Sequence, residues 1–145
     1  MDVLDQLTHE HRDAEELLTQ LVKGEPGDAR DAALTELGDI LALHMEVEER
    51  DAYPLVKEFL GADEFRASQH DHDAARALLA TAIEVAAGTT EFAIAITRLQ
   101  AELQNHVHHE ESEVFPQLRQ RADAQITALG DPAQLEARAA RRLSK

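Results

Sequence analysis

The sequence predicts an all-α protein, an up-down-up-down four-helix bundle with a short fifth helix at its C-terminal end. Apolar residues make up 43% of the 145 residues but aromatic residues only 3%, and leucine and alanine, which favour helices, supply much of the rest. Apolar residues also recur every three or four positions in four stretches that are separated by turn-forming sequences. Four such helices joined by short turns pack as one bundle, and the chain length suits one domain.

The turns divide the chain into the expected elements. They are marked by glycine, proline or small polar residues at 23–29, 60–64, 87–91 and 129–134. We assign residues 1–121 to the bundle and residues 122–145 to a helical tail, with the fifth helix from about 132 to 143.

Each of the four long helices is expected to bury one face, a stripe of apolar residues. In each stripe histidine or glutamate replaces the apolar residues near one height of the bundle. The stripes run through 4–21, 34–59, 65–86 and 92–114. The first and third contain one histidine each, and the second and fourth contain a histidine followed four residues later by a glutamate. That spacing places both side chains on one helix face, one turn apart.

The chain repeats itself. "HEHRDAEELLTQL" from His9 aligns with "HDHDAARALLATA" from His70, and "HMEVEERDAYP" from His44 aligns with "HVHHEESEVFP" from His106. The first two helices therefore resemble the last two, and a repeated helical hairpin produces a pseudo-twofold axis. Whatever one hairpin contributes at mid-height, the other contributes from the opposite side.

Six polar groups in a core are costly unless they are paired, and a pair of metal ions would remove that cost. We therefore predict a dinuclear centre in which each metal takes two histidines and both share two glutamates. The expected ligands are His11, His44, Glu48, His72, His106 and Glu110. Cysteine is absent, so this oxygen and nitrogen set suits iron or manganese, with zinc as an alternative. The competing interpretation is a set of core histidines bonded to neighbouring residues.

Three further residues are candidates for contacts with the centre or with a bound small molecule. Tyr53 and Phe115 occupy matching places in the repeat; both are expected to pack, with Tyr53 as an alternative hydrogen-bond donor to the site. Arg76 and Glu15 each follow a lone histidine by four residues and are expected on the side that faces the site. For both side chains we expect a salt bridge at the bundle end, or an arginine stem that covers apolar surface with its head in water. The alternatives are a hydrogen bond from Arg76 to a bound peroxide or a bridging carboxylate, and a further carboxylate ligand from Glu15.

Other residues near the motifs are expected to lie outside the centre. Glu49 and Glu111 are assigned to the solvated surface, with the orientation of a ligand histidine as the alternative. Pro54 and Pro116 should bend or end their helices. Helical geometry turns the remaining histidines away from the centre: His9, His70, His108 and His109.

The formal net charge of −15 disfavours nucleic acid and anionic membrane as partners. The last ten residues are locally basic, so the tail could pack on acidic surface or dock a protein partner. We find no apolar run long enough to span a membrane and no signal-peptide core, and we expect a cytoplasmic protein.

These motifs resemble the hemerythrin family in its broad sense, the hemerythrin-like HHE cation-binding domains, over roughly residues 3–121. The resemblance implies two iron ions in a non-haem centre with an oxo or hydroxo bridge, reactive toward O₂, hydrogen peroxide or nitric oxide. Manganese and zinc rank behind iron.

Two departures bear on function. Oxygen-carrying hemerythrins have a second histidine where this chain has Arg76, and they end on His-x-x-x-x-Asp where this chain has His106-x-x-x-Glu110. The ligand set is similar instead to di-iron proteins assigned to iron–sulfur repair, iron sensing or peroxide removal. We therefore expect redox chemistry, above all catalase-like peroxide removal. Sensing or binding of O₂, NO or iron, and iron–sulfur repair, are the alternatives to it, and simple O₂ carriage is disfavoured.

Overall fold

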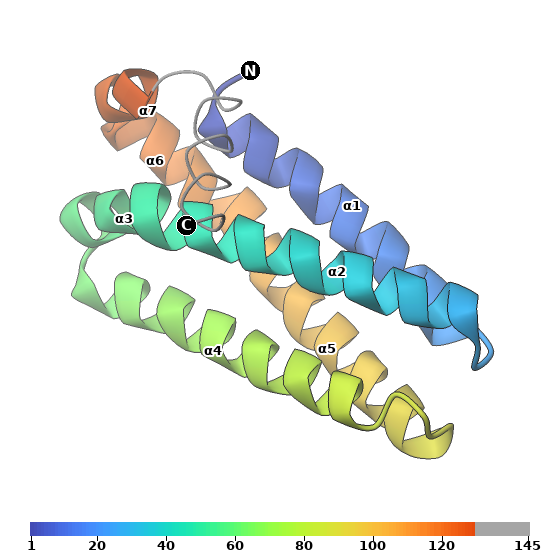
Figure 1. Cartoon of the computed structure of the whole chain (residues 1–145). Helices are drawn as coiled ribbons and strands as arrows, with labels where there is room; N and C mark the ends of the chain where they lie inside the picture. Colours follow the sequence, from blue (N-terminus) through green and yellow to red (C-terminus); the bar gives the residue numbers. More distant parts are fainter. Residues whose placement is uncertain (130–145) are drawn as a thin grey trace, which may run out of the picture.

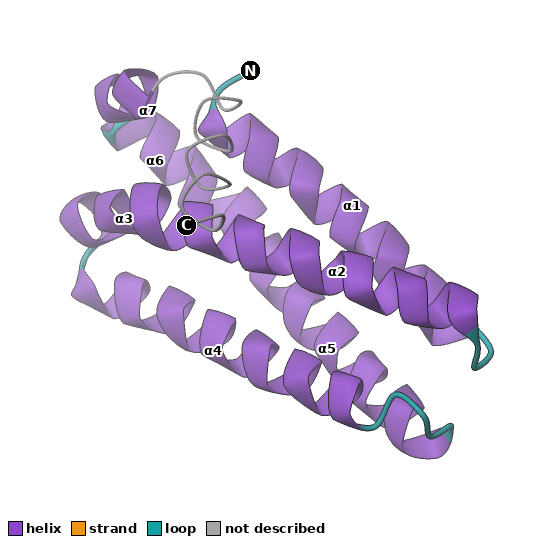
Figure 2. Cartoon of the chain, viewed as in Figure 1, coloured by secondary structure: helices purple, strands orange, loops and turns teal. Residues whose placement is uncertain are grey.

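The computed structural model describes residues 1–129 and confirms an all-α bundle with a short helix at its C-terminal side (Figures 1 and 2). The helical segments in chain order are α1 (Val3–Lys23), α2 (Asp28–Val47), η1 (Glu48–Ala52), α3 (Tyr53–Leu60), α4 (Ala62–Glu84), α5 (Thr90–His109), η2 (Glu110–Val114), α6 (Phe115–Arg121) and α7 (Asp123–Leu129).

Four long rods form the bundle. The first is α1 and the third is α4, whereas α2, η1 and α3 run on as the second rod and α5, η2 and α6 as the fourth. Consecutive rods run in opposite directions and pack side by side, and α1 also packs against α5 (Figure 1). This is the up-down-up-down arrangement that short connections impose on neighbouring helices.

The ends of the rods follow from local chemistry. Asp2 and Asp5 form a capping box at the start of α1, each backbone N–H donating to the other side chain at 3.1 and 2.9 Å. Gly61 ends α3 with a φ of 105°, a backbone conformation that suits glycine, and this permits the sharp turn into α4.

Neither motif proline ends its rod. The segments η1 and η2 are π-helical turns, in which the N–H groups of Tyr53 and Phe115 donate to the carbonyls of Glu48 and Glu110, five residues earlier. A proline cannot donate a backbone hydrogen bond and its ring clashes with the carbonyl four residues before it. The wider turn accommodates Pro54 and Pro116 without ending the helix, and such turns are frequent at functional sites.

Two apolar clusters fill the bundle, one on each side of a polar layer. One cluster contains Leu18, Leu37, Ile96 and their neighbours, and the other contains Leu7, Val56, Leu118 and theirs. Each fully buried leucine of this kind stabilises the fold by roughly 1.5–3 kcal/mol. The layer between the clusters holds the histidines and glutamates of the repeated motifs.

The C-terminal part is only partly described. The helix α7 packs on the bundle through the buried side chain of Ile126 and is described as far as Leu129. The expected fifth helix at 132–143 and the basic tail lie outside the described residues. None of the helices in residues 1–129 combines the length and apolar character that a membrane-spanning segment requires.

Candidate metal centre

The structure brings the six predicted ligand side chains together in the polar layer. They form two groups whose potential ligand atoms lie within 4.8 Å of one another: His11, His44, Glu48 and Glu110 in one, and Glu48, His72, His106 and Glu110 in the other. Each side chain is at most 5% exposed. The two glutamates belong to both groups, which is the sharing that a dinuclear centre requires.

Each of the four histidines is held from behind by a carboxylate. The distances from Nδ1 to the carboxylate oxygen are 2.8 Å for His11 and Glu111, 2.8 Å for His44 and Glu10, 2.7 Å for His72 and Glu49, and 3.0 Å for His106 and Asp71. A carboxylate there accepts a hydrogen bond from Nδ1–H and leaves Nε2 directed at the centre. Histidines that bind metals are commonly oriented in this way.

These carboxylates link the four rods in a closed ring. Glu10 on the first rod holds the histidine of the second, and Glu49 on the second holds that of the third. Asp71 on the third holds that of the fourth, and Glu111 on the fourth returns to His11 on the first. Each rod thus orients its neighbour's ligand, so the ligand geometry depends on the whole bundle.

The donor atoms fit a metal site because several of them lack other partners. Within the described chain, the buried atoms without a hydrogen-bond partner include His11 Nε2, both carboxylate oxygens of Glu48 and Glu110 Oε1. His11 Nε2 and Glu110 Oε1 are 3.2 Å apart but are not aligned as a hydrogen bond. Buried polar atoms are normally satisfied, and metal ions would satisfy these.

The charges in the layer compensate one another in the metal-free protein. Burial alone would lower the pKa of His44, but the charge of Glu48 and the hydrogen bond to Glu10 raise it from 6.5 to about 10. Burial likewise lowers the pKa of His106, yet the hydrogen bond and charge of Glu110 raise it to about 9. Burial raises the pKa of Glu48, but His44 outweighs it and holds that pKa well below 4.5. In the metal-free protein, the protons on His44 and His106 therefore supply part of the positive charge that metal ions would supply.

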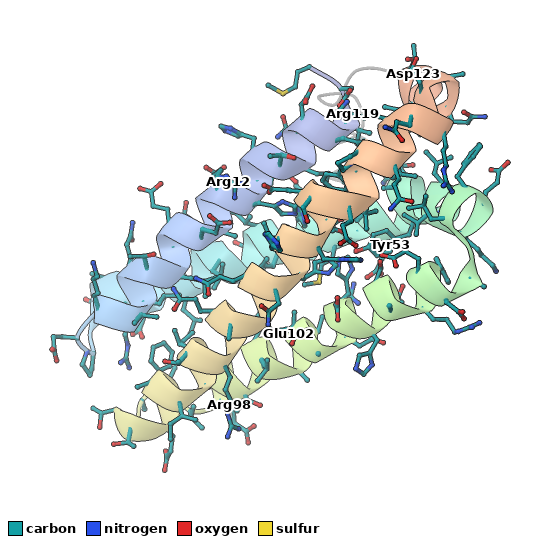
Figure 3. All side chains as sticks on the ribbon, turned by 180° about the vertical axis from the view of Figure 1, so that it is seen from behind. Arg12, Tyr53, Arg98, Glu102, Arg119 and Asp123 are labelled. Atoms are coloured by element: carbon teal, nitrogen blue, oxygen red, sulfur yellow. The ribbon has the colours of Figure 1, made fainter. Side chains whose placement is uncertain are left out.

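Tyr53 reaches the site, which was the alternative that the sequence left open. Its hydroxyl lies 2.7 Å from His72 Nε2 and 3.2 Å from His106 Nε2, and it donates to Glu110 Oε2 at 3.0 Å. Figure 3 labels Tyr53 among the side chains between the rods. The π-helical turn explains the position, because it adds a residue to the turn and brings Tyr53 round toward Glu48, the first residue of η1.

Phe115, which matches Tyr53 in the other half of the repeat, contacts the site only through its ring. Phe115 stacks on His11 with the ring centroids 6.1 Å apart and an interplanar angle of 8°. Phenylalanine has no hydroxyl, so the group around His11 and His44 receives no counterpart to the Tyr53 contacts. The repeat is symmetric in its ligands and asymmetric in this contact.

Arg76 and Glu15 do not enter the layer but form salt bridges, as expected, although both positions fall on the helix side that faces the site. Arg76 is 44% exposed and binds Glu49 at 2.7 Å, so its guanidinium contacts the carboxylate behind His72 rather than the centre. Glu15 lines the edge of a cavity beside the site, but its carboxylate binds Arg12 at 2.6 Å. Both side chains are long enough to turn from the buried stripe to the surface, which agrees with the expected salt bridges.

The remaining motif residues divide as follows. His9, His70 and His108 are exposed, and His109 is partly exposed and pairs with Glu64. Glu49 and Glu111, assigned first to the solvated surface, instead hold histidines, which was the alternative interpretation.

Sequence reasoning missed Glu10 and Asp71. A signal was present, because each stands directly before a lone motif histidine, in "HEH" and "HDH". The partner of each, however, lies on the next rod, and only the packing of the rods reveals it.

A comparison with family models decides the relationship. The model described as the hemerythrin HHE cation binding domain matches residues 2–118. The chain belongs to the hemerythrin HHE family. Comparisons with curated proteins and with solved structures gave no significant match. The family match covers the first three rods and the fourth as far as residue 118, and it includes all six side chains of the polar layer. This hemerythrin domain therefore has a buried histidine and glutamate cluster that fits a metal site.

Proposed function

We propose that this hemerythrin domain binds two iron ions and removes hydrogen peroxide in a catalase-like reaction. The observation that carries the proposal is the pair of ligand groups that share Glu48 and Glu110. Four imidazoles and two carboxylates without sulfur suit iron, and shared carboxylates suit two ions rather than one.

Two iron ions would supply a reversible two-electron couple next to a bound small molecule. In peroxide removal one hydrogen peroxide is reduced to two waters and a second is oxidised to O₂. Each half-reaction moves two electrons and two protons, so peroxide serves as both oxidant and reductant. No separate electron donor is needed, which suits a site enclosed in a single small domain.

The protein limits what can approach the centre. A cavity of about 20 Å³ adjoins the two groups, lined on its apolar side by Ala14, Leu18, Leu41, Ala75 and Leu103. A volume of that size is close to that of one water molecule. It excludes organic substrates, and only molecules of two or three heavy atoms or fewer, such as dioxygen, nitric oxide and hydrogen peroxide, approach the size that it admits.

Tyr53 supplies a polar group from the other side of the layer, because it belongs to the apolar cluster of Leu7 and Val56 and does not line the cavity. Burial, together with the charges of Glu48 and Glu110, raises the pKa of Tyr53 well above 10, so its hydroxyl keeps its proton. A neutral hydroxyl that turns away from Glu110 Oε2 can donate its one hydrogen bond to a small oxygen species while it remains next to His72 and His106.

Reversible binding of O₂ or NO, as in a sensor, is the second candidate, and the enclosure of all six ligands favours it. The two functions differ in turnover. Iron-loaded protein should release O₂ from hydrogen peroxide over many cycles in an oxygen-electrode assay. A variant in which His106→Ala removes a ligand should lose this activity, and His108→Ala, on the exposed side of the same helix, should retain it. A stable oxy or nitrosyl spectrum without turnover would instead support the binding protein.

A further inference from the structure

Two arginines lie outside the polar layer, and each binds a carboxylate that holds a histidine. Arg76 donates to Glu49 Oε2 at 2.7 Å, and the same oxygen lies 2.7 Å from His72 Nδ1. Arg12 donates to Glu111 Oε1, while Oε2 of that carboxylate lies 2.8 Å from His11 Nδ1. A guanidinium, a carboxylate and an imidazole therefore follow one another in both halves of the bundle (Figure 3 labels Arg12 on α1).

The two halves place these arginines at different positions in the repeat. Arg12 directly follows its histidine and pairs with Glu15 at 2.6 Å. In the other half the charges are exchanged: Asp73 directly follows His72 and pairs with Arg76 at 3.4 Å. Both arrangements nevertheless place one guanidinium on the equivalent carboxylate, Glu111 in one half and Glu49 in the other. Accidental surface ion pairs would not be expected to form at the same carboxylate in both halves.

The contacts from guanidinium to carboxylate to imidazole should change how strongly the histidine Nε2 donates electrons to a metal. A carboxylate on Nδ1–H draws the proton away from the ring and makes Nε2 a stronger electron donor to a metal. A guanidinium on that carboxylate takes up part of its negative charge and weakens the effect. A more weakly donating imidazole, with a positive charge nearby, favours the lower oxidation state of the metal.

We infer that Arg12 and Arg76 are positioning residues that raise the reduction potential of the metal pair through Glu111 and Glu49. The inference rests on the proposed iron centre and assigns it a control that the ligands alone do not supply. It also gives Arg76 a role although its side chain does not touch the ligand atoms. Arg76 should act more strongly than Arg12, because Glu49 uses one oxygen for both contacts.

The test is the midpoint potential of iron-loaded protein, measured by a spectroelectrochemical titration. Arg76→Gln and Arg12→Gln should each lower the potential at full iron content, with the larger shift for Arg76, and the double variant should shift it further. Arg76→Lys retains the charge and should retain most of the potential. Because the two side chains are 44% and 50% exposed, these variants should fold.

The exchanged charges provide a rescue within the same chain. The double variant Arg12→Asp with Glu15→Arg reproduces the order of Asp73 and Arg76 in the first half, and it should restore the potential that Arg12→Gln lowers. Arg66→Gln removes an exposed arginine that pairs with Asp63, also three residues away, and it should leave the potential unchanged.

Each result bears on one proposal. Full iron content with an unchanged potential in Arg12→Gln and Arg76→Gln would overturn the inference and leave the iron centre intact. Loss of iron in these variants would also overturn it, because the arginines would then assemble the site rather than tune it. Absence of iron from the wild-type protein would overturn the proposed function itself.

Discussion

The hydroxyl of Tyr53 lies 2.7 Å from Nε2 of His72, although the two residues stand on different rods. The contact places a proton-bearing oxygen beside one ligand group, whereas Phe115 provides only a ring at the matching place beside the other. The two ligand groups should consequently differ in how they bind metal and in how much each contributes to the stability of the metal-free protein.

Tyr53→Phe keeps the ring and removes the hydroxyl. We expect the metal-free protein to lose roughly 1–3 kcal/mol of unfolding free energy, because buried partners are left unsatisfied. The iron-loaded protein should lose less, since the metals then satisfy the imidazole and carboxylate atoms. Urea unfolding with and without iron measures both values, and an equal loss in the two states would contradict the contact as the structure shows it.

The carboxylates behind the histidines should matter for metal affinity. Glu10→Gln and Asp71→Asn should each weaken iron binding by about 10–100-fold, because they alter the orientation and basicity of a ligand imidazole. Asp13→Asn, on the exposed part of α1, serves as the control and should bind iron normally. Competition with a chelator of known affinity gives the values, and an unchanged affinity in Glu10→Gln would refute its role at His44.

Stability of the metal-free protein should depend on pH in a defined window. The raised pKa values mean that His44 and His106 add stability that is complete below pH 6.5 and is lost as pH rises through about 10 for His44 and about 9 for His106. The lowered pKa of Glu48 adds stability that is complete above 4.5 and is lost as pH falls through its folded-state value. Their joint contribution is therefore largest between about pH 4.5 and 6.5.

Iron changes this pH dependence, because the metal replaces the protons on the ligand histidines. Iron-loaded protein should keep its stability between pH 6.5 and 9, where the metal-free protein loses some, and iron affinity should rise with pH over that range. Thermal unfolding across the range, with and without iron, checks the difference. Parallel curves for the two forms would show that these histidines do not exchange protons for metal.

The small cavity lined by Ala75 should control how fast hydrogen peroxide reaches the metal centre. Ala75→Val adds two carbon atoms to the wall beside His72 and should slow peroxide turnover while iron content stays near that of the wild type. Overpacking of this kind costs typically 1–3 kcal/mol, so a matched control is needed. Ala95→Val lies in the same apolar cluster but does not line the cavity. Equal turnover in both variants would mean that small molecules reach the centre by another route.

Sequence patterns predicted the fold and the six clustered side chains because both depend on spacing along single helices. His44 and Glu48, four residues apart, must share a face wherever the bundle places it. The π-helical turns were not predicted, since Pro54 allows a bend, an end or a wider turn, and the choice depends on packing of the whole rod. The sequence left two roles open for Arg76, a salt bridge and a contact with the centre, because a long flexible side chain can leave the face that its Cα occupies.

Contacts between rods were beyond the reach of the sequence patterns. Glu10 and His44 are separated by 34 positions, and their hydrogen bond depends on the rotation of α1 against α2. Only the relative placement of the helices decides that Glu10 faces a histidine of the neighbouring rod instead of solvent.

The number of iron ions per chain tests the central claim most directly. Elemental analysis of purified protein reconstituted with ferrous iron should give close to two ions per chain, and Glu110→Ala, which removes a residue common to both groups, should reduce both together. One ion per chain, or full occupancy in Glu110→Ala, would contradict a centre that is built on shared glutamates.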